Sequence, residues 1–420
     1  MRSVHLIGIG GAGVSALARV FLARGDLVTG CDQRASATTE ALLREGAGVV
    51  TGHDPAHVRG VDLVVYSGAI GASAELDAAR DAGIQVLTRA EALAGLIAQH
   101  DSVAVAGTHG KTTVSFMLGH ILTRAGWDPS VLVGDGTSSR AGRSRWLVAE
   151  ADESDGSLAL HRPRHAILTN CEFDHSDHFA SVDEVRSLFA GFLAVLPEAG
   201  IAVVCADDPL LTELGTPARR VTYGFAGGAG YRPGEGVLEG LKLPVPGRHN
   251  LVNAAGAAAM AIELGVDPKV TLAALATFPG AHRRLENLGS WRGATLYDDY
   301  GHHPTEVSAT LQAARELPHR RLIVVFQPHR YSRYLQFEAG FAAALGGADS
   351  VVVTEIYPAG EANPGGVTAE PLADAAGGRF AADFTTARHL LEETVEAGDL
   401  VLFMGAGDIW RLGGELAQQG

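Results

Sequence analysis

Short runs of consecutive apolar residues alternate along the whole chain with Ala- and Leu-rich segments of helical periodicity. Runs that are apolar at every position are typical of parallel strands covered by helices on both faces. The predicted strands are Val4–Ile7, Leu27–Cys31, Leu63–Tyr66, Val103–Ala106, Trp146–Ala149, Ala166–Thr169, Ile201–Cys205, Ala294–Tyr297, Leu322–Phe326, Ser350–Thr354 and Leu400–Met404. The repeated alternation of strand and helix predicts an α/β fold with mainly parallel sheets.

A glycine directly after a predicted strand and before a predicted helix recurs at Gly8, Gly107 and Gly405. This recurrence in a chain of 420 residues predicts three consecutive α/β domains. The domains are predicted to span residues 1–98, 99–279 and 280–420. Residues 226–247 are rich in Gly and Pro, which predicts turns and short strands within the central domain.

Charge and cysteine content narrow the classes of function. The chain carries 33 Lys+Arg and 48 Asp+Glu, for a net charge of −15, so neither nucleic acid nor an anionic membrane is an expected partner. Three cysteines without a CxxC pair favour a reducing compartment over a disulfide framework. Glycines interrupt the apolar run near Met1, and no apolar stretch is long enough to cross a membrane. We therefore expect a cytoplasmic protein.

The first glycine motif is Gly8-x-Gly10-x-x-Gly13, which follows a strand and opens a helix, with Asp32 at the end of the next strand. Backbone N–H groups at such a turn bind a pyrophosphate, and the spacing is that of a dinucleotide site. The motif alone leaves three interpretations open: NAD(P), another phosphorylated ligand, or a turn without a ligand.

The second glycine motif, GTHGKTT at residues 107–113, is more specific. It follows an apolar strand and leads into a predicted helix, as in loops that surround the phosphates of a nucleotide. Lys111 is predicted to reach the β- and γ-phosphate oxygens, and Thr112 is predicted to face Mg²⁺. Val105 occupies the first glycine position of the Walker pattern, so the loop is a shortened version. The alternative is an ordinary helix start.

Acidic and histidine-containing segments follow two predicted strands of the central domain, Trp146–Ala149 and Ala166–Thr169. The segment EADESD begins at Glu150, where an acid commonly holds Mg²⁺; the alternative is a solvated acidic turn. The segment DHSDH contains His175 and predicts either a metal site or a polar loop. Because Mg²⁺ prefers oxygen ligands, we expect at most one histidine near it.

Polar clusters also follow the Gly/Pro-rich segment and two strands of the third domain. Asn250 opens an Ala-rich helix, which it could cap; alternatively, Asn253 and His249 face a nucleotide base. The segments DDYGHHPTE and QPHRYSR both begin at the carboxyl ends of predicted parallel strands, where open α/β sheets place ligands. Their Tyr, His and Arg side chains suit carboxylate and phosphoryl groups.

These segments, taken in order, resemble the Mur ligase family: GIGGAG, GTHGKTT, EADESD, TNCEFDHSD, GRHNLVNA, DDYGHHPTEV and FQPHRYSR. The last two are the most specific, and the set covers nearly the whole chain. The resemblance implies a Rossmann-like N-terminal domain that binds a UDP-sugar and a central P-loop domain that binds ATP. It also implies a Rossmann-like C-terminal domain that closes over ATP and the amino acid. NAD is then not expected at the first glycine loop.

The resemblance further implies an ATP-dependent ligase of peptidoglycan precursor synthesis, acting as a monomer or homodimer. Within the family, the motifs are similar to ligases that join L-alanine to the carboxylate of UDP-N-acetylmuramate through an acyl phosphate. The segment EFDHSD is instead similar to the ligase that attaches recycled tripeptide to the same sugar, which is the alternative.

The resemblance assigns roles to residues of this sequence. ATP binding is implied for Gly107, Thr108, His109, Gly110, Lys111, Thr112, Thr113, His249, Asn250, Asn253 and Arg283. UDP-sugar binding is implied for Gly8, Gly10, Gly11, Ala12, Gly13, Asp32, Ser67 and His175. Mg²⁺ binding is implied for Thr112, Glu150 and His175. Catalytic roles are implied for Lys111, Tyr300, His302, Arg330 and Arg333, with His329 adjacent.

Overall fold

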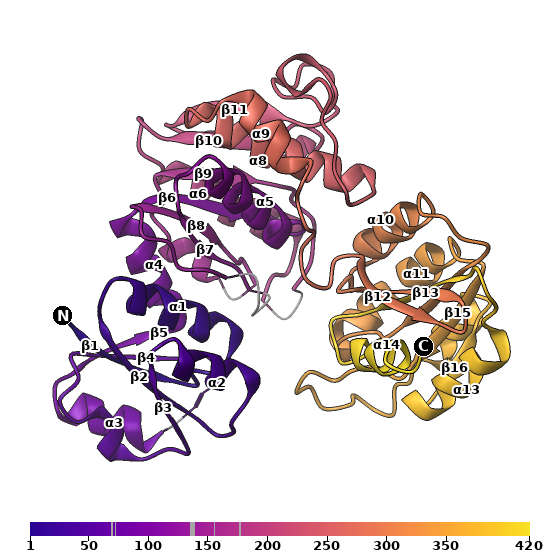
Figure 1. The fold of residues 1–420 in the computed structure, drawn as a ribbon, viewed down its shortest axis with the longest axis horizontal. Coiled ribbons are helices and arrows are strands. Elements are labelled where there is room, and N and C mark those ends of the chain that lie inside the picture. Colours follow the sequence, from indigo (N-terminus) through magenta and orange to yellow (C-terminus); the bar gives the residue numbers. More distant parts are fainter. Residues whose placement is uncertain (69, 72, 135–138, 155, 176–177) are drawn as a thin grey trace. The chain divides into compact units, whose positions relative to one another are not determined.

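The computed structural model describes residues 1–420 except residues 69, 72, 135–138, 155 and 176–177 (Figure 1). The chain divides into two compact units, which are described separately. The first unit comprises Met1–Glu172, Ser181–Lys242 and Val252–Thr277. The second comprises Phe173–Ala180, Leu243–Leu251 and Phe278–Gly420. Among the described residues, no helix combines the length and apolarity that crossing a membrane requires.

The N-terminal part of the first unit is a five-stranded parallel sheet with the order β3-β2-β1-β4-β5. Its elements are β1 (Ser3–Ile7), α1 (Ala12–Ala23), β2 (Leu27–Asp32), α2 (Ala37–Arg44), β3 (Gly48–Thr51), the 3-10 helix η1 (Pro55–Val58), β4 (Leu63–Tyr66), α3 (Ala74–Asp81), β5 (Gln85–Thr88) and α4 (Arg89–Gln99). Side chains alternate between faces, so Leu6 packs with α1 and α4, whereas Ile7 packs with α3 on the other face.

The rest of the first unit contains a six-stranded parallel sheet with the order β11-β10-β9-β6-β8-β7. Its elements are β6 (Asp101–Ala106), α5 (Lys111–Arg124), β7 (Ser130–Leu132), β8 (Trp146–Glu150), the 3-10 helix η2 (Ser157–Leu160), β9 (His165–Leu168), α6 (Val182–Ala194), β10 (Ile201–Cys205), α7 (Pro209–Thr212), β11 (Arg219–Tyr223), the 3-10 helix η3 (Gly236–Leu238), α8 (Arg248–Glu263) and α9 (Pro268–Leu275). Leu132 and Leu147 belong to the same buried core as α1, so the two sheets of this unit share a hydrophobic core.

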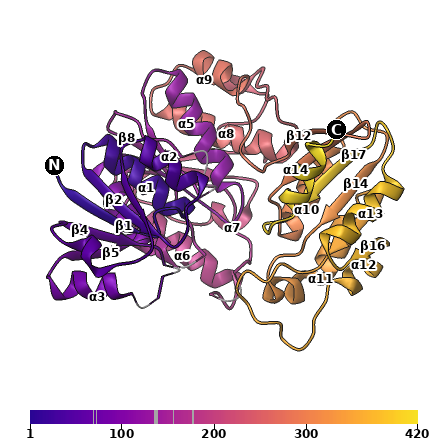
Figure 2. The ribbon, with the colours of Figure 1, turned by 60° about the horizontal axis from the view of Figure 1, so that its bottom comes forward.

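The second unit is built on a six-stranded sheet with the order β12-β13-β17-β14-β15-β16, in which only the β12–β13 pair is antiparallel among the described strands. Its elements are β12 (Glu286–Trp291), β13 (Ala294–Asp299), α10 (Pro304–Ala314), β14 (Leu322–Phe326), α11 (Tyr331–Leu345), β15 (Ser350–Thr354), α12 (Glu370–Ala375), β16 (Arg379–Ala381), α13 (Phe384–Thr394), β17 (Leu400–Met404) and α14 (Trp410–Ala417). Helices α10, α11 and α12 bury one core with this sheet, and α13 and α14 bury another (Figure 2).

The predicted α/β class and the predicted strands are confirmed, each within a few residues of its expected bounds. Gly8, Gly107 and Gly405 all have positive φ at strand-to-helix turns, as expected. The expectation of short strands in residues 226–247 is wrong, because the described backbone there forms an isolated bridge at Tyr231 and a single 3-10 turn. Glycine and proline interrupt that segment too often for a ladder of hydrogen bonds to extend.

Candidate active site

The glycine loop between β6 and α5 forms an open helix N-terminus. Gly107 has φ +129°, and a Cβ atom there would lie 2.0 Å from Thr169 Oγ1. Gly110 has φ +82°, and a Cβ atom there would lie 2.7 Å from Asn253 Oδ1. Helix α5 begins without a side-chain cap, so no cap side chain engages its first N–H groups, an arrangement that can accept an anion.

Lys111 is buried at the base of this loop, with 9% of its surface exposed. Its Nζ donates to the carbonyl oxygens of Gly107 at 2.7 Å and Thr108 at 3.1 Å. The Glu153 carboxylate accepts from the same ammonium at 2.8 and 3.0 Å. Burial lowers the pKa of Lys111, but the neighbouring carboxylates, Glu153 first, outweigh burial and hold the pKa above its ordinary value. The site therefore keeps a fixed positive charge inside the loop.

Burial raises the pKa of Glu153 to about 7, although Lys111 opposes this. Glu153 is 1% exposed, and its carboxylate competes for the same ammonium that a phosphate group would need. The sequence pattern pointed to this acidic segment, but it did not identify Glu153 as the partner of Lys111. Asp155, in the same segment, lies outside the described residues.

Thr112 and Glu150 meet where α5 begins and β8 ends. The Thr112 hydroxyl is 3.0 Å from both carboxylate oxygens of Glu150, and the backbone N–H of Gly134 donates to Glu150 at 2.8 Å. Burial raises the pKa of Glu150 above its ordinary value, with Lys111 as the main opposing influence. The predicted proximity of a Thr hydroxyl and a strand-end carboxylate is thus found in the structure.

The loop backbone is held by residues at the end of β9. The Asn170 side chain accepts from the N–H of His109 at 2.8 Å, and the Thr169 hydroxyl donates to the His109 carbonyl at 2.6 Å. The Thr108 hydroxyl bonds the backbone of Glu172. The motif alone could not predict these contacts. The loop after β9 reaches the glycine loop only because β6 and β9 pair in the sheet.

The first glycine loop joins β1 to α1 in the same unit. The N–H groups of Gly8 and Ile9 donate to the Cys31 carbonyl at 2.8 and 3.1 Å. Asp32 Oδ2 accepts from the N–H of Gly10 at 3.0 Å. Asp32 thus binds the loop itself, whereas the acid of a dinucleotide site faces a ribose. Ser67 lies beside Gly8, since a Cβ atom on Gly8 would come within 3.4 Å of the Ser67 side chain.

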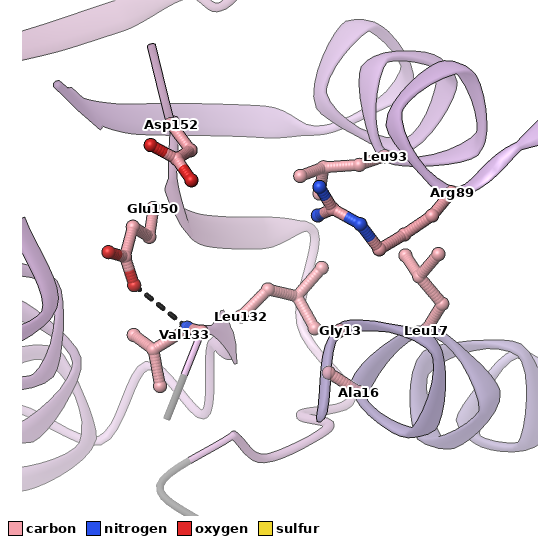
Figure 3. Close-up of a pocket in the computed structure, with 10 residues that line it drawn as sticks. Gly13, Ala16, Leu17, Arg89, Leu93, Leu132, Val133, Glu150 and Asp152 are labelled. Carbon is pink, nitrogen blue, oxygen red and sulfur yellow. Dashed lines mark hydrogen bonds between the residues drawn. The ribbon is translucent and has the colours of Figure 1, made fainter. Parts of the chain in front are cut away.

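A pocket lies between α1, α4 and the strand ends that carry Glu150 (Figure 3). It encloses about 470 Å³, including its open mouth. Figure 3 shows Arg89 reaching over the pocket from one side, with Glu150 and Asp152 on the other. A Cβ atom on Gly13 would lie 2.7 Å from Arg89 Cδ, so the third glycine of the first motif makes room for this arginine. Arg89 was missed from the sequence because no motif surrounds it.

In the second unit, the two polar segments predicted at strand ends come together, because β13 and β14 both pair with β17. The rings of His302 and His329 are 5.8 Å apart, and the rings of Tyr300 and His302 are 5.2 Å apart. Burial lowers the pKa of His302 to about 3 and that of His329 to about 4, so both rings are neutral at pH 7.

Strained backbone occurs at two arginines near this cluster. Arg283 has φ +54° and Arg330 has φ +67°, values that non-glycine residues rarely adopt. Arg283 donates to Asp298 at 2.7 Å and to the carbonyl of Gly405 at 2.7 Å, so it holds the third glycine loop. Its guanidinium lies 5.1 Å from the centre of the Tyr300 ring. Binding of nucleotide phosphates by Arg283 stays a prediction.

Arg333 is also engaged within the second unit. Its guanidinium forms a buried, bidentate pair with Asp174, with donor–acceptor distances of 2.8 to 3.1 Å. Burial raises the pKa of Asp174, but Arg333 outweighs burial and the net pKa is far below its ordinary value. His175 follows with φ +55°. Because Glu150 lies in the first unit and His175 in the second, their joint metal site stays a prediction. Asp177 lies outside the described residues.

Of the alternatives for this segment, capping of the helix by Asn250 is wrong. Helix α8 already begins at Arg248, and the Asn250 amide donates back to the carbonyl of Pro246 at 2.7 Å. Gly247, with φ +102°, makes the preceding turn and allows the helix to start earlier. Burial lowers the pKa of His249 to about 4. Asn253 lies against Gly110, so it borders the glycine loop, and its contact with a nucleotide base stays a prediction.

Three models of Mur ligase domains match most of the chain: the catalytic domain at residues 3–101, the middle domain at residues 105–261 and the glutamate ligase domain at residues 283–407. The chain belongs to the Mur ligase family. The glycine loops at Gly8 and Lys111 and the cluster at His302 each fall within one of these matched ranges.

Relatives in this family cover almost the full chain. A UDP-N-acetylmuramate–L-alanine ligase of Renibacterium salmoninarum is 44% identical over 98% of this chain and 94% of its own length. One of Kineococcus radiotolerans is 45% identical over 98% of this chain and 95% of its own length. A crystal structure of UDP-N-acetylmuramate-alanine ligase from Thermotoga maritima superposes with a TM-score of 0.79 at 28% identity, covering 100% of this chain and 99% of that chain.

Proposed function

We propose that this chain joins L-alanine to the carboxylate of UDP-N-acetylmuramate at the expense of ATP, producing UDP-N-acetylmuramoyl-L-alanine, ADP and phosphate. The observation that carries the proposal is the glycine loop with Lys111 buried inside it, beside Thr112 and Glu150. The relatives that are 44% and 45% identical over nearly the whole chain support the choice of substrates. The product belongs to peptidoglycan precursor synthesis.

The reaction proceeds in two transfers. The sugar carboxylate attacks the γ-phosphorus of ATP. ADP departs as the leaving group, and an acyl phosphate is formed. The α-amino group of L-alanine then attacks the acyl carbon, the amide bond forms and phosphate leaves. Lys111 neutralises the charge on the transferring phosphoryl group, and positioning of the reactants accounts for much of the remaining rate enhancement.

The residues around Thr112 fit a magnesium ion. The Thr112 hydroxyl and the Glu150 carboxylate are hard oxygen donors already gathered within 3.0 Å of each other. Bound Mg²⁺ would neutralise charge on the β- and γ-phosphates. His175 is the proposed protein ligand of a second ion, shared with Glu150. The open N-terminus of α5, with Asn253 beside it, supports nucleotide binding at this end of the sheet.

The first glycine loop is the proposed site of the UDP-sugar diphosphate, with Ser67 beside Gly8 and His175 contributing. The start of α1, which has no side-chain cap, suits a pyrophosphate, whereas the N–H groups of Gly8, Ile9 and Gly10 are engaged within the turn. The pocket that Arg89 covers opens next to Glu150, which supports it as the place where the muramyl carboxylate approaches the ATP site. Arg89 is the one cationic side chain among the described residues that line this pocket.

The cluster in the second unit is proposed to serve the amine and the acyl phosphate. Arg330 and Arg333 provide cationic donors for a carboxylate or a phosphoryl group. The neutral imidazole of His302, whose Nδ1 lies 2.9 Å from the Tyr300 carbonyl, provides an oriented hydrogen-bonding group without adding charge. This proposal keeps the domain role expected from the sequence, in which residues 280–420 close over ATP and the amino acid.

A reducing cytoplasm is the proposed compartment, supported by three buried free cysteines. We also propose that the enzyme acts as a monomer or homodimer, which the sedimentation velocity of the purified chain tests.

The deciding experiment measures phosphate release from ATP and Mg²⁺ in the presence of UDP-N-acetylmuramate. Three arms contain L-alanine, the tripeptide L-Ala-γ-D-Glu-diaminopimelate, or no amine. Release with L-alanine alone supports the proposal. Release with the tripeptide alone would instead make the chain a recycling ligase, and release in neither arm would refute ligase activity with this sugar.

A further inference from the structure

A second cluster of ligating side chains lies away from the loops described above. His5 on β1, Cys31 on β2, His57 in η1 and Glu75 in α3 converge on the face of the first sheet that α3 covers. One ligand atom from each of the four residues lies within 4.8 Å of the other three. The ligands come from four separate elements, which explains why no spacing motif revealed them.

Three members of this cluster are removed from solvent. Glu75 and Cys31 are 0% exposed and His5 is 1% exposed. The Glu75 carboxylate lies 2.8 Å from His57 Nδ1, and the Cys31 thiol donates to it at 3.2 Å. His53 Nδ1, also 2.8 Å from Glu75, orients the carboxylate from the solvent side. The group is therefore packed and ordered before any ion enters.

His5 shows that hydrogen bonds alone do not satisfy the cluster. Its Nδ1 lies 2.9 Å from the Thr29 hydroxyl, and its Nε2 is buried with no hydrogen-bond partner in the structure. Leaving a buried polar nitrogen unpaired is unfavourable, because the nitrogen gives up its hydrogen bond to water and gains none in return. Burial lowers the pKa of His5 to about 4, so Nε2 does not escape this cost by protonation. An unprotonated imidazole nitrogen with a free lone pair is the form that binds a metal ion.

We propose that His5, Cys31, His57 and Glu75 bind one Zn²⁺ ion. Two imidazoles, a thiolate and a carboxylate are the mixed donor set of a closed, four-coordinate zinc site, whereas Mg²⁺ and Ca²⁺ take oxygen ligands. Zinc bonds of about 2.0–2.3 Å place tetrahedral ligand atoms roughly 3.3–3.7 Å apart. The separations of 2.8 to 4.8 Å in this cluster bracket that spacing, so small side-chain adjustments suffice.

Charge balance agrees with the assignment. Binding transfers the Cys31 thiol proton to solvent, and the resulting thiolate together with the Glu75 carboxylate neutralises the two positive charges of the ion. His57 binds as the tautomer protonated on Nε2, which leaves its Nδ1 lone pair for the metal. Affinity therefore increases with pH as long as the thiol must be deprotonated.

The site lies directly behind the first glycine loop. The backbone carbonyl of Cys31 accepts the N–H groups of Gly8 and Ile9, and the next residue, Asp32, accepts the N–H of Gly10. An ion on the Cys31 side chain would thus brace the residue that holds the loop. The proposed zinc is structural, is separate from the magnesium at Thr112, and goes beyond the ligase activity.

Cobalt spectroscopy tests the proposal on the full chain, purified without a histidine tag and stripped with a chelator. Co²⁺ should bind at one equivalent per chain and give the visible bands of tetrahedral cobalt, together with a near-ultraviolet thiolate-to-cobalt charge-transfer band. Zn²⁺ should abolish both signals by displacement. Co²⁺ at the magnesium site lacks a thiolate and cannot produce the charge-transfer band, so the two sites are distinguished.

Variants locate the site. Cys31→Ser should eliminate the charge-transfer band, and His57→Ala should weaken cobalt binding about 10- to 100-fold or more. His57 is part-exposed, so its variant keeps the test valid if Cys31→Ser does not fold. The matched controls are Cys205→Ser, which removes another buried thiol, and His100→Ala, which removes a histidine of the same compact unit outside the cluster. Both should bind cobalt normally.

Three results would overturn the proposal: no tetrahedral cobalt spectrum, a charge-transfer band that persists in Cys31→Ser, or equal binding by His57→Ala and the wild-type chain. Circular dichroism of each variant establishes that the comparison is made between folded proteins.

Discussion

Replacing Lys111 with alanine should abolish ligation while leaving the UDP-sugar site intact. The ammonium makes two bonds to loop carbonyls and pairs with both oxygens of Glu153, so it is the buried charge at the point where the phosphates would lie. Removing one charged side chain that contacts a transferring phosphoryl group typically reduces turnover by about 10³-fold or more. This corresponds to about 4 kcal/mol of transition-state stabilisation.

The same change should not unfold the protein. Removing one partner of a buried ion pair usually costs about 3–5 kcal/mol, because it leaves an uncompensated charge. Here Glu153 already has its pKa raised to about 7 by burial, and losing Lys111 removes the largest opposing influence, so the carboxyl becomes protonated near neutral pH. The remaining cost is that of lost hydrogen bonds, about 1–3 kcal/mol.

The assay compares phosphate release, isothermal titration with UDP-N-acetylmuramate, and thermal unfolding for Lys111→Ala. The control is Lys269→Ala, which removes an exposed lysine on α9. We expect turnover to fall at least 10³-fold, sugar affinity to stay within about twofold, and the control to match the wild-type chain. Turnover within tenfold of wild type would refute the role of Lys111, and parallel loss of sugar binding would show that the loop is not specific to ATP.

Further expectations concern the glycine loop at Gly107, the titration of Glu153, the role of Arg330 in amide formation, and domain closure on ligand binding. Gly107→Ala should remove ATP affinity in a nucleotide titration, because its Cβ would lie 2.0 Å from Thr169 Oγ1 at a φ of +129°; unchanged affinity would contradict the loop geometry. The folded-state pKa of Glu153 is raised from 4.5 to about 7, so its stabilising contribution is complete below about pH 4.5 and is lost as pH rises through about 7. Glu153→Gln, which cannot ionise, should therefore flatten this part of the stability–pH curve measured by urea unfolding, and an unaltered curve would argue against the shift. Arg330→Ala should lower amide formation about 10²-fold with little change in sugar binding, and an unchanged rate at saturating L-alanine would exclude this role. Small-angle scattering should show a smaller radius of gyration with ATP analogue and UDP-sugar than without them, and equal radii would refute closure.

The strand pattern shows how far the sequence alone determined the fold. The predicted strands correspond to interior strands of the three sheets, such as β1, β6 and β14, which are apolar on both faces. The strands missed are the edge strands β3, β5, β7, β11, β12 and β16. Edge strands are short or partly exposed, so they lack a continuous apolar run, and a neighbouring strand supplies the pairing that defines them. Their existence depends on the assembled sheet.

The candidate site likewise contains residues that the sequence identified and residues that only the structure revealed. The sequence identified Lys111, Thr112 and Glu150 because a phosphate loop needs those residue types at fixed positions relative to a strand and a helix. It could not identify Glu153 as the partner of Lys111, nor Arg89 as a pocket residue, because burial and distance decide those roles.

Local sequence therefore determined the glycine loops, the interior strands and the residue types of the candidate phosphate site, since each depends on residues close together in the chain. Tertiary structure decided the sheet edges, the ion pair of Lys111 and the cluster around Glu75. The physical reason is that strand pairing and side-chain burial depend on contacts between residues far apart in the sequence. No local spacing encodes which of those residues become neighbours.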